Sequence, residues 1–286
     1  MVPVEQLIKA RLHGSILVAA FGFNFAYKRT LAHASRAWLE ESASAPNGTW
    51  GSFEDFVDAS YSDLLESDGK PKGLISISIP FYAWATFKFG FGAYAFQASS
   101  AGWWYLMDMK TEDTRLIIPL KIFEPYNLKP GVRQENVMKE VDLRPLWCIC
   151  RDGTLGVPVI GELPELCRGN EAFERADGSP RKTMKVKINW PGYAPSDKQI
   201  RPLSDKGDRS IKRLMTLVAG KVCAFLDEHA TACTAKMGTE AAYVIGTQTG
   251  EISSRDVLLL GIVIVSEGAA TPILRLRDDF LSQGLV

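Results

Sequence analysis

The sequence predicts an α+β fold with a β-rich, mainly antiparallel sheet, built as a sandwich or a partial barrel. N-terminal helices and one long amphipathic helix near residues 209–229 accompany it. Three observations predict this class. Apolar residues recur at helical spacing near the N-terminus and again over 211–226, a period of two begins at residue 74, and Gly, Pro and Asp-Gly turns separate the later segments. Consecutive strands this closely spaced are most simply joined as an antiparallel meander.

Three helices are expected in the N-terminal part of the chain. The first covers residues 3–12, and the second covers about 28–42, where apolar side chains form one stripe. A Pro-Asn-Gly cluster at 46–48 stops the second helix. The third helix is expected over 52–66, with its phenylalanines on one side.

Strands follow in the middle of the chain. Ile75, Ile77 and Ile79 alternate with serines, which is typical of a half-buried strand, and aromatic residues continue the alternation. A further strand is predicted over 103–109, and a turn leads from it into another strand over 115–123. These segments together would form the meander.

The rest of the chain alternates strands with one helix. An Asp-Gly pair at 152–153 predicts a two-residue hairpin turn. Alternating lysines mark a strand over 185–190, which a Pro-Gly pair ends. After the amphipathic helix, two closing strands are expected over 257–265 and 273–276.

The composition is that of an ordinary globular protein. The chain has 286 residues, of which 46% are hydrophobic and 23% charged, and no Pro/Gly-rich linker divides it. We therefore expect a single domain over 1–286, with a helical portion of about 1–70 packed on a β-rich core of about 71–286.

The compartment predicted is intracellular, either cytoplasmic or nuclear. Five cysteines, an odd number with irregular spacing, fit a reducing environment. No apolar run approaches the roughly 20 residues that a spanning helix needs, so no transmembrane segment is expected.

Aromatic residues are concentrated in one part of the chain. Residues 74–126 contain 13 of the 29 aromatic residues. They either fill a thick sandwich core or line an apolar pocket or interface. The candidate ligand-binding residues are Tyr82, Trp84, Trp103, Trp104 and Tyr105.

Charge is distributed in two opposite blocks, although 33 basic residues balance 33 acidic ones overall. Residues 37–69 carry eight acidic side chains and no basic one, whereas 181–221 carry eleven basic and three acidic side chains. Such blocks favour internal pairing, head-to-tail self-association, or contact with phosphate or nucleic acid. The candidate anion-binding residues are Lys185, Lys187, Arg209, Lys212 and Arg213.

No motif for catalysis or metal binding is present. Cys148, Cys150 and Cys167 lack the paired spacing of structural zinc sites, and none of the three histidines lies in a nucleophile or metal motif. We expect no metal and no cofactor, and the sequence leaves open whether the chain is an enzyme.

One segment resembles known sequences. The stretch Trp190-Pro191-Gly192-Tyr193, then Gln199-Ile200-Arg201, and the helix from Ile211-Lys212-Arg213 to Phe225 are similar to a segment of uncharacterised proteins of mushroom-forming fungi. The resemblance covers residues 190–226. It implies a fungal source and no particular activity.

Three functions are consistent with these patterns. The first is a non-catalytic binding or self-assembly protein, whose partner is itself or another protein, using an aromatic-rich sheet and opposed acidic and basic faces. The second is a pocket enzyme or small-molecule binder lined by the aromatic residues. The third is a phosphate or nucleic-acid binder acting through the basic block at 181–221.

Overall fold

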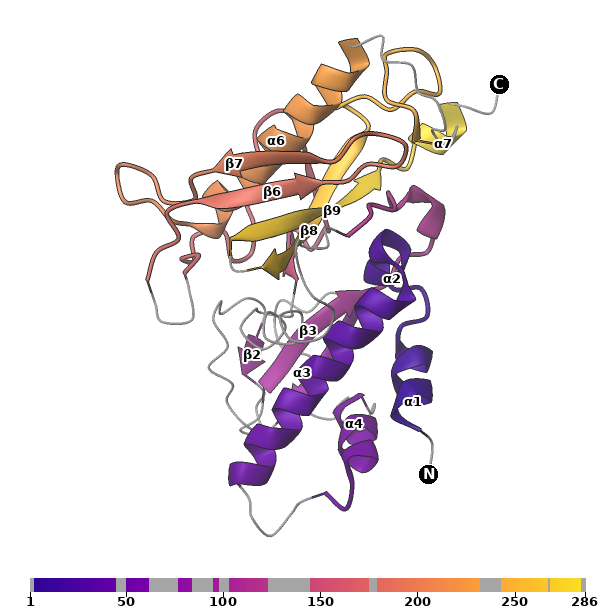
Figure 1. Cartoon of the computed structure of the whole chain (residues 1–286), viewed down its shortest axis with the longest axis vertical. Helices are drawn as coiled ribbons and strands as arrows, with labels where there is room; N and C mark the ends of the chain where they lie inside the picture. The colour runs from indigo at the N-terminus through magenta and orange to yellow at the C-terminus, as the bar shows by residue number, and fades with distance from the viewer. Residues whose placement is uncertain are drawn as a thin grey trace.

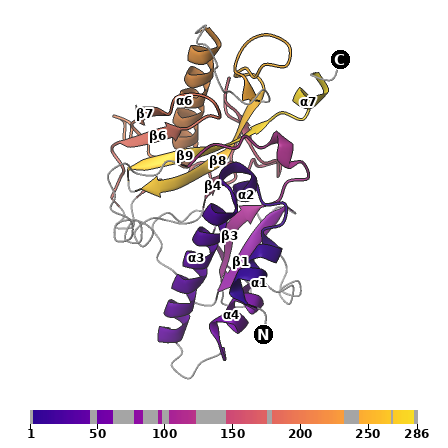
Figure 2. The ribbon, with the colours of Figure 1, turned by 45° about the vertical axis from the view of Figure 1, so that its right-hand side comes forward.

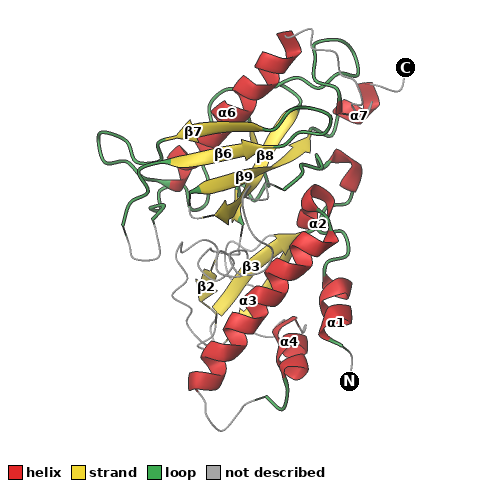
Figure 3. Ribbon diagram, viewed as in Figure 1, coloured by secondary structure: helices red, strands yellow, loops and turns green. Residues whose placement is uncertain are grey.

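The computed structural model describes residues 3–44, 50–61, 77–83, 95–97, 103–122, 145–174, 179–231, 243–266 and 268–283. The chain forms two sheets, which lie in different halves of the molecule along its longest axis (Figure 1). One is antiparallel and the other mixed, and neither closes into a barrel. Together with the helices they confirm the predicted α+β class (Figure 3).

Four helices form the N-terminal part, α1 (Val4–Arg11), α2 (Ile16–Phe21), α3 (Phe23–Ser44) and α4 (Phe53–Tyr61). Three of them were predicted, and α3 begins earlier than expected. Helix α2 was not expected, because its run of apolar residues has no helical period. Ser15 begins it by accepting a hydrogen bond from the Val18 amide, and Gly22, at a φ of 85°, separates it from α3.

The first sheet contains β1 (Ser78–Ala83), β2 (Ala95–Gln97) and β3 (Trp103–Met109), in the order β1-β3-β2. The predicted meander is therefore wrong, because β3 lies in the centre and β1 does not pair with the next strand along the chain. Helices α3, α4 and α2 pack on this sheet (Figure 2).

The strand predicted over 115–123 is also wrong. A 3-10 turn, η2 (Thr114–Leu116), follows β3 instead, capped by the Asp113 side chain. The next residues cross to the other sheet, where Ile117 pairs with Arg275 in a single bridge and the Ile118 amide donates to the Leu274 carbonyl at 3.0 Å.

A bulge interrupts the pairing of β1 with β3. Ile79 pairs with Asp108 and Pro80 pairs with Leu106, so Met107 has no partner in β1. Pro80 has no N–H to donate, which suits a bulge in an edge strand. The extra residue turns Asp108 to the same face as Tyr105, the face that the helices cover.

The second sheet contains β4 (Leu146–Trp147), β5 (Val157–Pro158), β6 (Met184–Ile188), β7 (Ser196–Ile200), β8 (Val257–Ser266) and β9 (Ala269–Leu276). Its order is β4-β8-β9-β6-β7, with β5 also paired to β8. The pair β6–β9 is parallel and the other described pairs are antiparallel. A hairpin forms at the predicted Asp-Gly pair, but its loop has three residues rather than two. The Cys150 amide donates to the Thr154 carbonyl at 2.8 Å and the Gly153 amide donates to the Cys150 carbonyl at 3.0 Å.

Helix α6 (Ile211–Thr231) covers one face of this sheet with its buried apolar stripe, and the short α7 (Phe280–Gln283) ends the described chain. Buried residues of both sheets and all the long helices belong to one continuous apolar cluster. Arg29 of α3 also joins the two halves, because its Nη1 donates to the Ile264 carbonyl at 3.0 Å. The predicted boundary near residue 70 lies outside the described residues.

Candidate functional site

The predicted aromatic site divides between the two faces of the first sheet. Trp84 lies outside the described residues, and Tyr82 pairs with Trp104 in the ladder between β1 and β3. Trp103 is half-buried, whereas Trp104 and Tyr105 are both buried. Because neighbouring residues of a strand point to opposite faces, Trp104 and Tyr105 lie on different sides of the sheet.

The Tyr105 face is a packed aromatic core. The His33 ring meets the rings of Tyr105 and Phe81 edge-on, with centroids 5.2 and 5.1 Å apart. Phe81 also contacts the rings of Phe56 and Tyr61 at 5.9 and 5.2 Å. Such edge-to-face contacts hold α3 and α4 on the sheet.

A buried carboxyl group lies beside this aromatic core. Asp108 is 1% exposed. Its Oδ2 contacts the Ser15 hydroxyl, and its Oδ1 accepts from the Met109 amide at 2.7 Å and from the Leu17 amide at 3.2 Å. Burial raises the pKa of Asp108 to about 7, although the hydrogen bonds from Ser15, Met109 and Leu17 oppose this rise.

Tyr61 of α4 is a titratable group on which the charge of this carboxyl acts. Burial raises the pKa of the Tyr61 hydroxyl well above its ordinary value, and the charge of Asp108 raises it further. A hydrogen bond with Thr30 and the positive charge of Arg11 act in the opposite direction. Tyr61 is therefore a neutral hydroxyl at any physiological pH.

Sequence reasoning missed this polar cluster. The signal available was an aspartate inside an otherwise apolar strand, Trp103–Met109, with a proline in the preceding strand. Regular alternation would place Asp108 opposite the Tyr105 face, and only the bulge brings it under the helices. The group is closed off from solvent, so it holds helices rather than meeting a substrate.

The predicted anion-binding residues form two separate groups. Lys185 and Lys187 lie on the outer face of β6, where both form ion pairs with Asp197 of β7, the first at 3.1 Å. Lys187 contributes most to lowering the pKa of Asp197. Val186, between the two lysines, is buried on the α6 side.

The other group surrounds the start of α6. Arg209 forms an ion pair with Glu174 at 2.8 Å. Arg213 donates from Nε to the Pro202 carbonyl at 2.9 Å, and Lys212 is half-buried in the first turn of the helix. The structure thus places these three residues away from the outer face that carries Lys185.

The Trp-Pro-Gly-Tyr segment at 190–193 connects β6 with β7 and contacts the end of α6. Trp190 Nε1 donates to the Tyr243 carbonyl at 2.9 Å, and the Tyr193 hydroxyl accepts from the Ile245 amide at 2.8 Å. The Tyr193 ring also meets the His229 ring edge-on at 5.2 Å. These contacts give the Trp-Pro-Gly-Tyr sequence a structural role.

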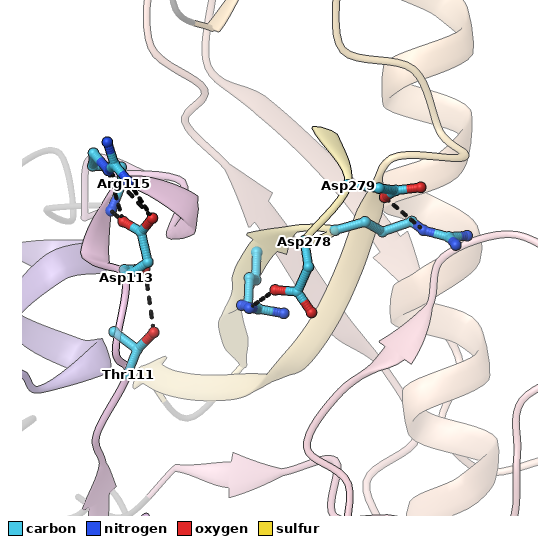
Figure 4. A network of polar contacts seen from close by, with 7 residues as sticks. Thr111, Asp113, Arg115, Asp278 and Asp279 are labelled. Carbon is cyan, nitrogen blue, oxygen red and sulfur yellow. Dashed lines mark hydrogen bonds and ion pairs between the residues drawn. The ribbon is translucent and has the colours of Figure 1, made fainter. Parts of the chain in front are cut away.

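Three exposed acid–arginine pairs lie where η2 meets the end of β9 (Figure 4). Asp113 pairs with Arg115 at 2.7 Å, and this arginine holds the pKa of Asp113 at about 2. On the β9 side, Asp278 contacts Arg275. The third pair joins residues 277 and 279 at 3.5 Å. Exposed pairs of this kind stabilise a fold only weakly.

Cysteine and metal chemistry find no support in the described part of the chain. Cys148 and Cys150 are buried, and burial raises the pKa of both thiols. The described residues contain no group of three His, Cys, Asp or Glu side chains arranged to hold a metal ion. Among them there is also no helix of the length and apolarity needed to cross a membrane.

Comparison with protein-family models, with curated proteins and with solved structures finds no match to this chain.

Proposed function

We propose that the chain is a non-catalytic self-assembly protein whose copies associate through oppositely charged ends. One observation carries the proposal. The acidic last turns of α3 and helix α4 lie toward one end of the long axis, whereas the basic strands β6 and β7 and the start of α6 lie in the opposite half (Figures 1 and 2).

The acidic end consists of the last turns of α3 and the whole of α4. Over the described residues from Ala37 to Tyr61 there are five acidic side chains and no basic one. Glu40, Asp55 and Asp58 are exposed. These segments of α3 and α4 therefore carry a net negative charge.

The basic end keeps positive charge after its internal pairs are counted. Asp197, Glu174 and Glu228 form ion pairs with four of its cations, so three negative charges face four positive ones. Lys182 and Lys206 are exposed and form no ion pair with another described residue. The basic end is thus only partly neutralised by its own carboxylates.

The acidic segments and the basic strands lie in different halves of the molecule (Figure 1). A second copy can bring them together head to tail. Such a heterologous contact either closes into a ring or extends as an open chain. Salt weakens it, since the Debye length falls from about 10 Å at 0.1 M to about 3 Å at 1 M ionic strength.

Light scattering coupled to size-exclusion chromatography tests the proposal. At low salt we expect a mass well above 31.6 kDa, which falls toward that value at high salt. The double variant Lys182→Glu/Lys206→Glu should remain monomeric at low salt. A salt-insensitive monomer in the wild type would refute self-assembly.

A matched variant controls for net charge. Lys9→Glu/Lys28→Glu makes the same change in charge on exposed residues of α1 and α3, in the other half of the molecule. We expect it to assemble as the wild type does. If it abolishes assembly equally, total charge rather than the basic end is responsible, and the head-to-tail contact is wrong.

A further inference from the structure

The outer face of the β6–β7 hairpin is a polar sheet surface that is open to solvent. Helix α6 packs on the other face of these strands, and in Figure 1 the strands lie in front of it. Lys185 pairs with Gln199 across the hairpin, and both residues are exposed. The side chains of Lys185 and Asp197 remain 53% and 39% exposed even though they form an ion pair. This face is therefore accessible to a partner.

Two cations lie at the open end of this hairpin. Lys182 comes two residues before β6, and Arg201 follows β7 directly. Because β6 and β7 are antiparallel, the start of one strand lies beside the end of the other. Both residues are exposed, and neither forms an ion pair with another described residue. Arg201 contributes only its carbonyl to the fold, which accepts from Arg213 Nη2 at 3.3 Å.

Asp197 limits the length of an acidic partner on this face. Its carboxylate lies four residues before Arg201, which is about 13 Å along a strand. A long polyanion such as nucleic acid, following the strands, would bring its phosphates over this carboxylate. A short acidic element meets the cations at the open end and stops before Asp197. The face therefore suits a short acidic element better than an extended polyanion.

Helix α4 has the complementary charges and the matching length. Asp55 and Asp58 are exposed, and neither forms an ion pair with another described residue. They lie three positions apart and share one face of the helix, separated by about 5 Å, as are neighbouring strands of a sheet. The nine residues of α4 span about 13 Å. Helix α4 and the hairpin lie in different halves of the molecule (Figure 2).

We propose that the outer face of the β6–β7 hairpin binds helix α4 of a second copy, with Lys182 and Arg201 against Asp55 and Asp58. This contact rests on the proposed self-assembly and names the two surfaces that form it. Both surfaces are polar and exposed, so the attraction between them depends on charge and is screened by salt. Each copy uses one surface to bind and the other to be bound, so successive copies add head to tail.

Exchanging the charges of the two surfaces tests this contact. Asp55→Lys/Asp58→Lys and Lys182→Asp/Arg201→Asp each bring like charges together. At low salt, where the wild type is larger, each double variant should therefore have a mass of 31.6 kDa by light scattering. The chain with all four substitutions keeps the wild-type net charge and again brings opposite charges together, so it should assemble. If this chain stays monomeric, the contact is wrong.

The outcomes separate this contact from the proposed function. A salt-insensitive monomer in the wild type refutes self-assembly and the contact together. If the wild type and both double variants assemble equally, the contact is wrong while self-assembly stands. If nuclease treatment dissolves the wild-type complexes, the hairpin binds nucleic acid and not α4, which also overturns the contact.

A cross-linking measurement on the wild type keeps the proposal testable if a variant does not fold. A carbodiimide couples a carboxyl group directly to an amine. In a mixture of unlabelled and nitrogen-15-labelled protein, a cross-linked peptide pair that carries both isotopes joins two copies. We expect mass spectrometry to find Lys182 of one copy joined to Asp55 or Asp58 of another. If Lys182 is joined only to other carboxyl groups, the contact is overturned.

Discussion

The two sheets of this chain treat their polar groups in opposite ways. The second sheet keeps its charges on the outer face of β6 and β7, where Asp197 joins two lysines in water. The first sheet encloses a carboxyl group beneath helices α2, α3 and α4 and surrounds it with neutral donors. Solvent screens the exposed charges of the second sheet, so they contribute little to stability. The buried carboxyl group of the first sheet depends on every one of its hydrogen-bond partners being present.

The largest loss of stability is expected from a substitution in the aromatic core of the first sheet. Phe81→Ala removes a ring that contacts His33, Phe56 and Tyr61, and we expect a loss of about 3–5 kcal/mol in denaturant unfolding. Leu39→Ala is the control, because Leu39 is 67% exposed. Equal effects of the two variants would show that this core does not hold the helices.

A substitution at the centre of the second sheet should lower stability nearly as much. Gly261 pairs with Trp147 at a register shift of β8. A Cβ at Gly261 would lie 3.0 Å from the Trp147 Cα and closer still to the Leu146 carbonyl oxygen. We expect Gly261→Ala to cost about 1–3 kcal/mol, measured by thermal unfolding. Gly220→Ala, on an open helix surface, should be neutral or stabilising.

Two variants of Asp108 distinguish the contribution of its hydrogen bonds to stability from the contribution of its charge. Asp108→Ala leaves two amides and the Ser15 hydroxyl without their acceptor, and we expect a loss of about 1–3 kcal/mol at pH 6. Asp108→Asn should lose much less under the same conditions. Equal losses at pH 6 would mean that shape alone, not hydrogen bonding, matters at this position.

The smallest effect is expected on the outer face of the second sheet. Asp197→Asn should cost at most about 1 kcal/mol, because Asp197 is 39% exposed. The lysines lower the pKa of Asp197, so its contribution is present above the unfolded value and is lost as pH falls. Acid therefore weakens this sheet. From pH 7 to pH 3 the urea midpoint of the wild type should fall further than that of Asp197→Asn, and 1 M salt should remove this difference.

Local patterns predicted most elements, and tertiary contacts decided the rest. Helix α6 and strand β3 follow from spacing within a few residues, and the structure confirms them. A hairpin also forms at Asp152-Gly153, with a loop one residue longer than predicted. Helix α2 was missed because Ile16–Phe21 is apolar throughout. The order β1-β3-β2 is set by packing on the helices, which no strand pattern encodes.

The candidate sites were harder to predict for the same reason. Residue type identified the lysines of β6 but not that Asp197 would pair with both. Alternation cannot locate Asp108, because a single unpaired residue, Met107, reverses the face that it occupies. The sequence alone therefore cannot predict on which face of a sheet a polar residue lies when a bulge is next to it.

Strand β7 is an edge strand of the second sheet, and its charged residues bear on the proposed association between copies of this chain. A bare sheet edge invites growth by strand addition into fibrils, which dissociate slowly. Here the edge strand is five residues long and carries Asp197 and Lys198, the latter paired with Glu228 of α6. The proposed assemblies should therefore dissolve on dilution into salt and bind no amyloid dye, unlike fibrils.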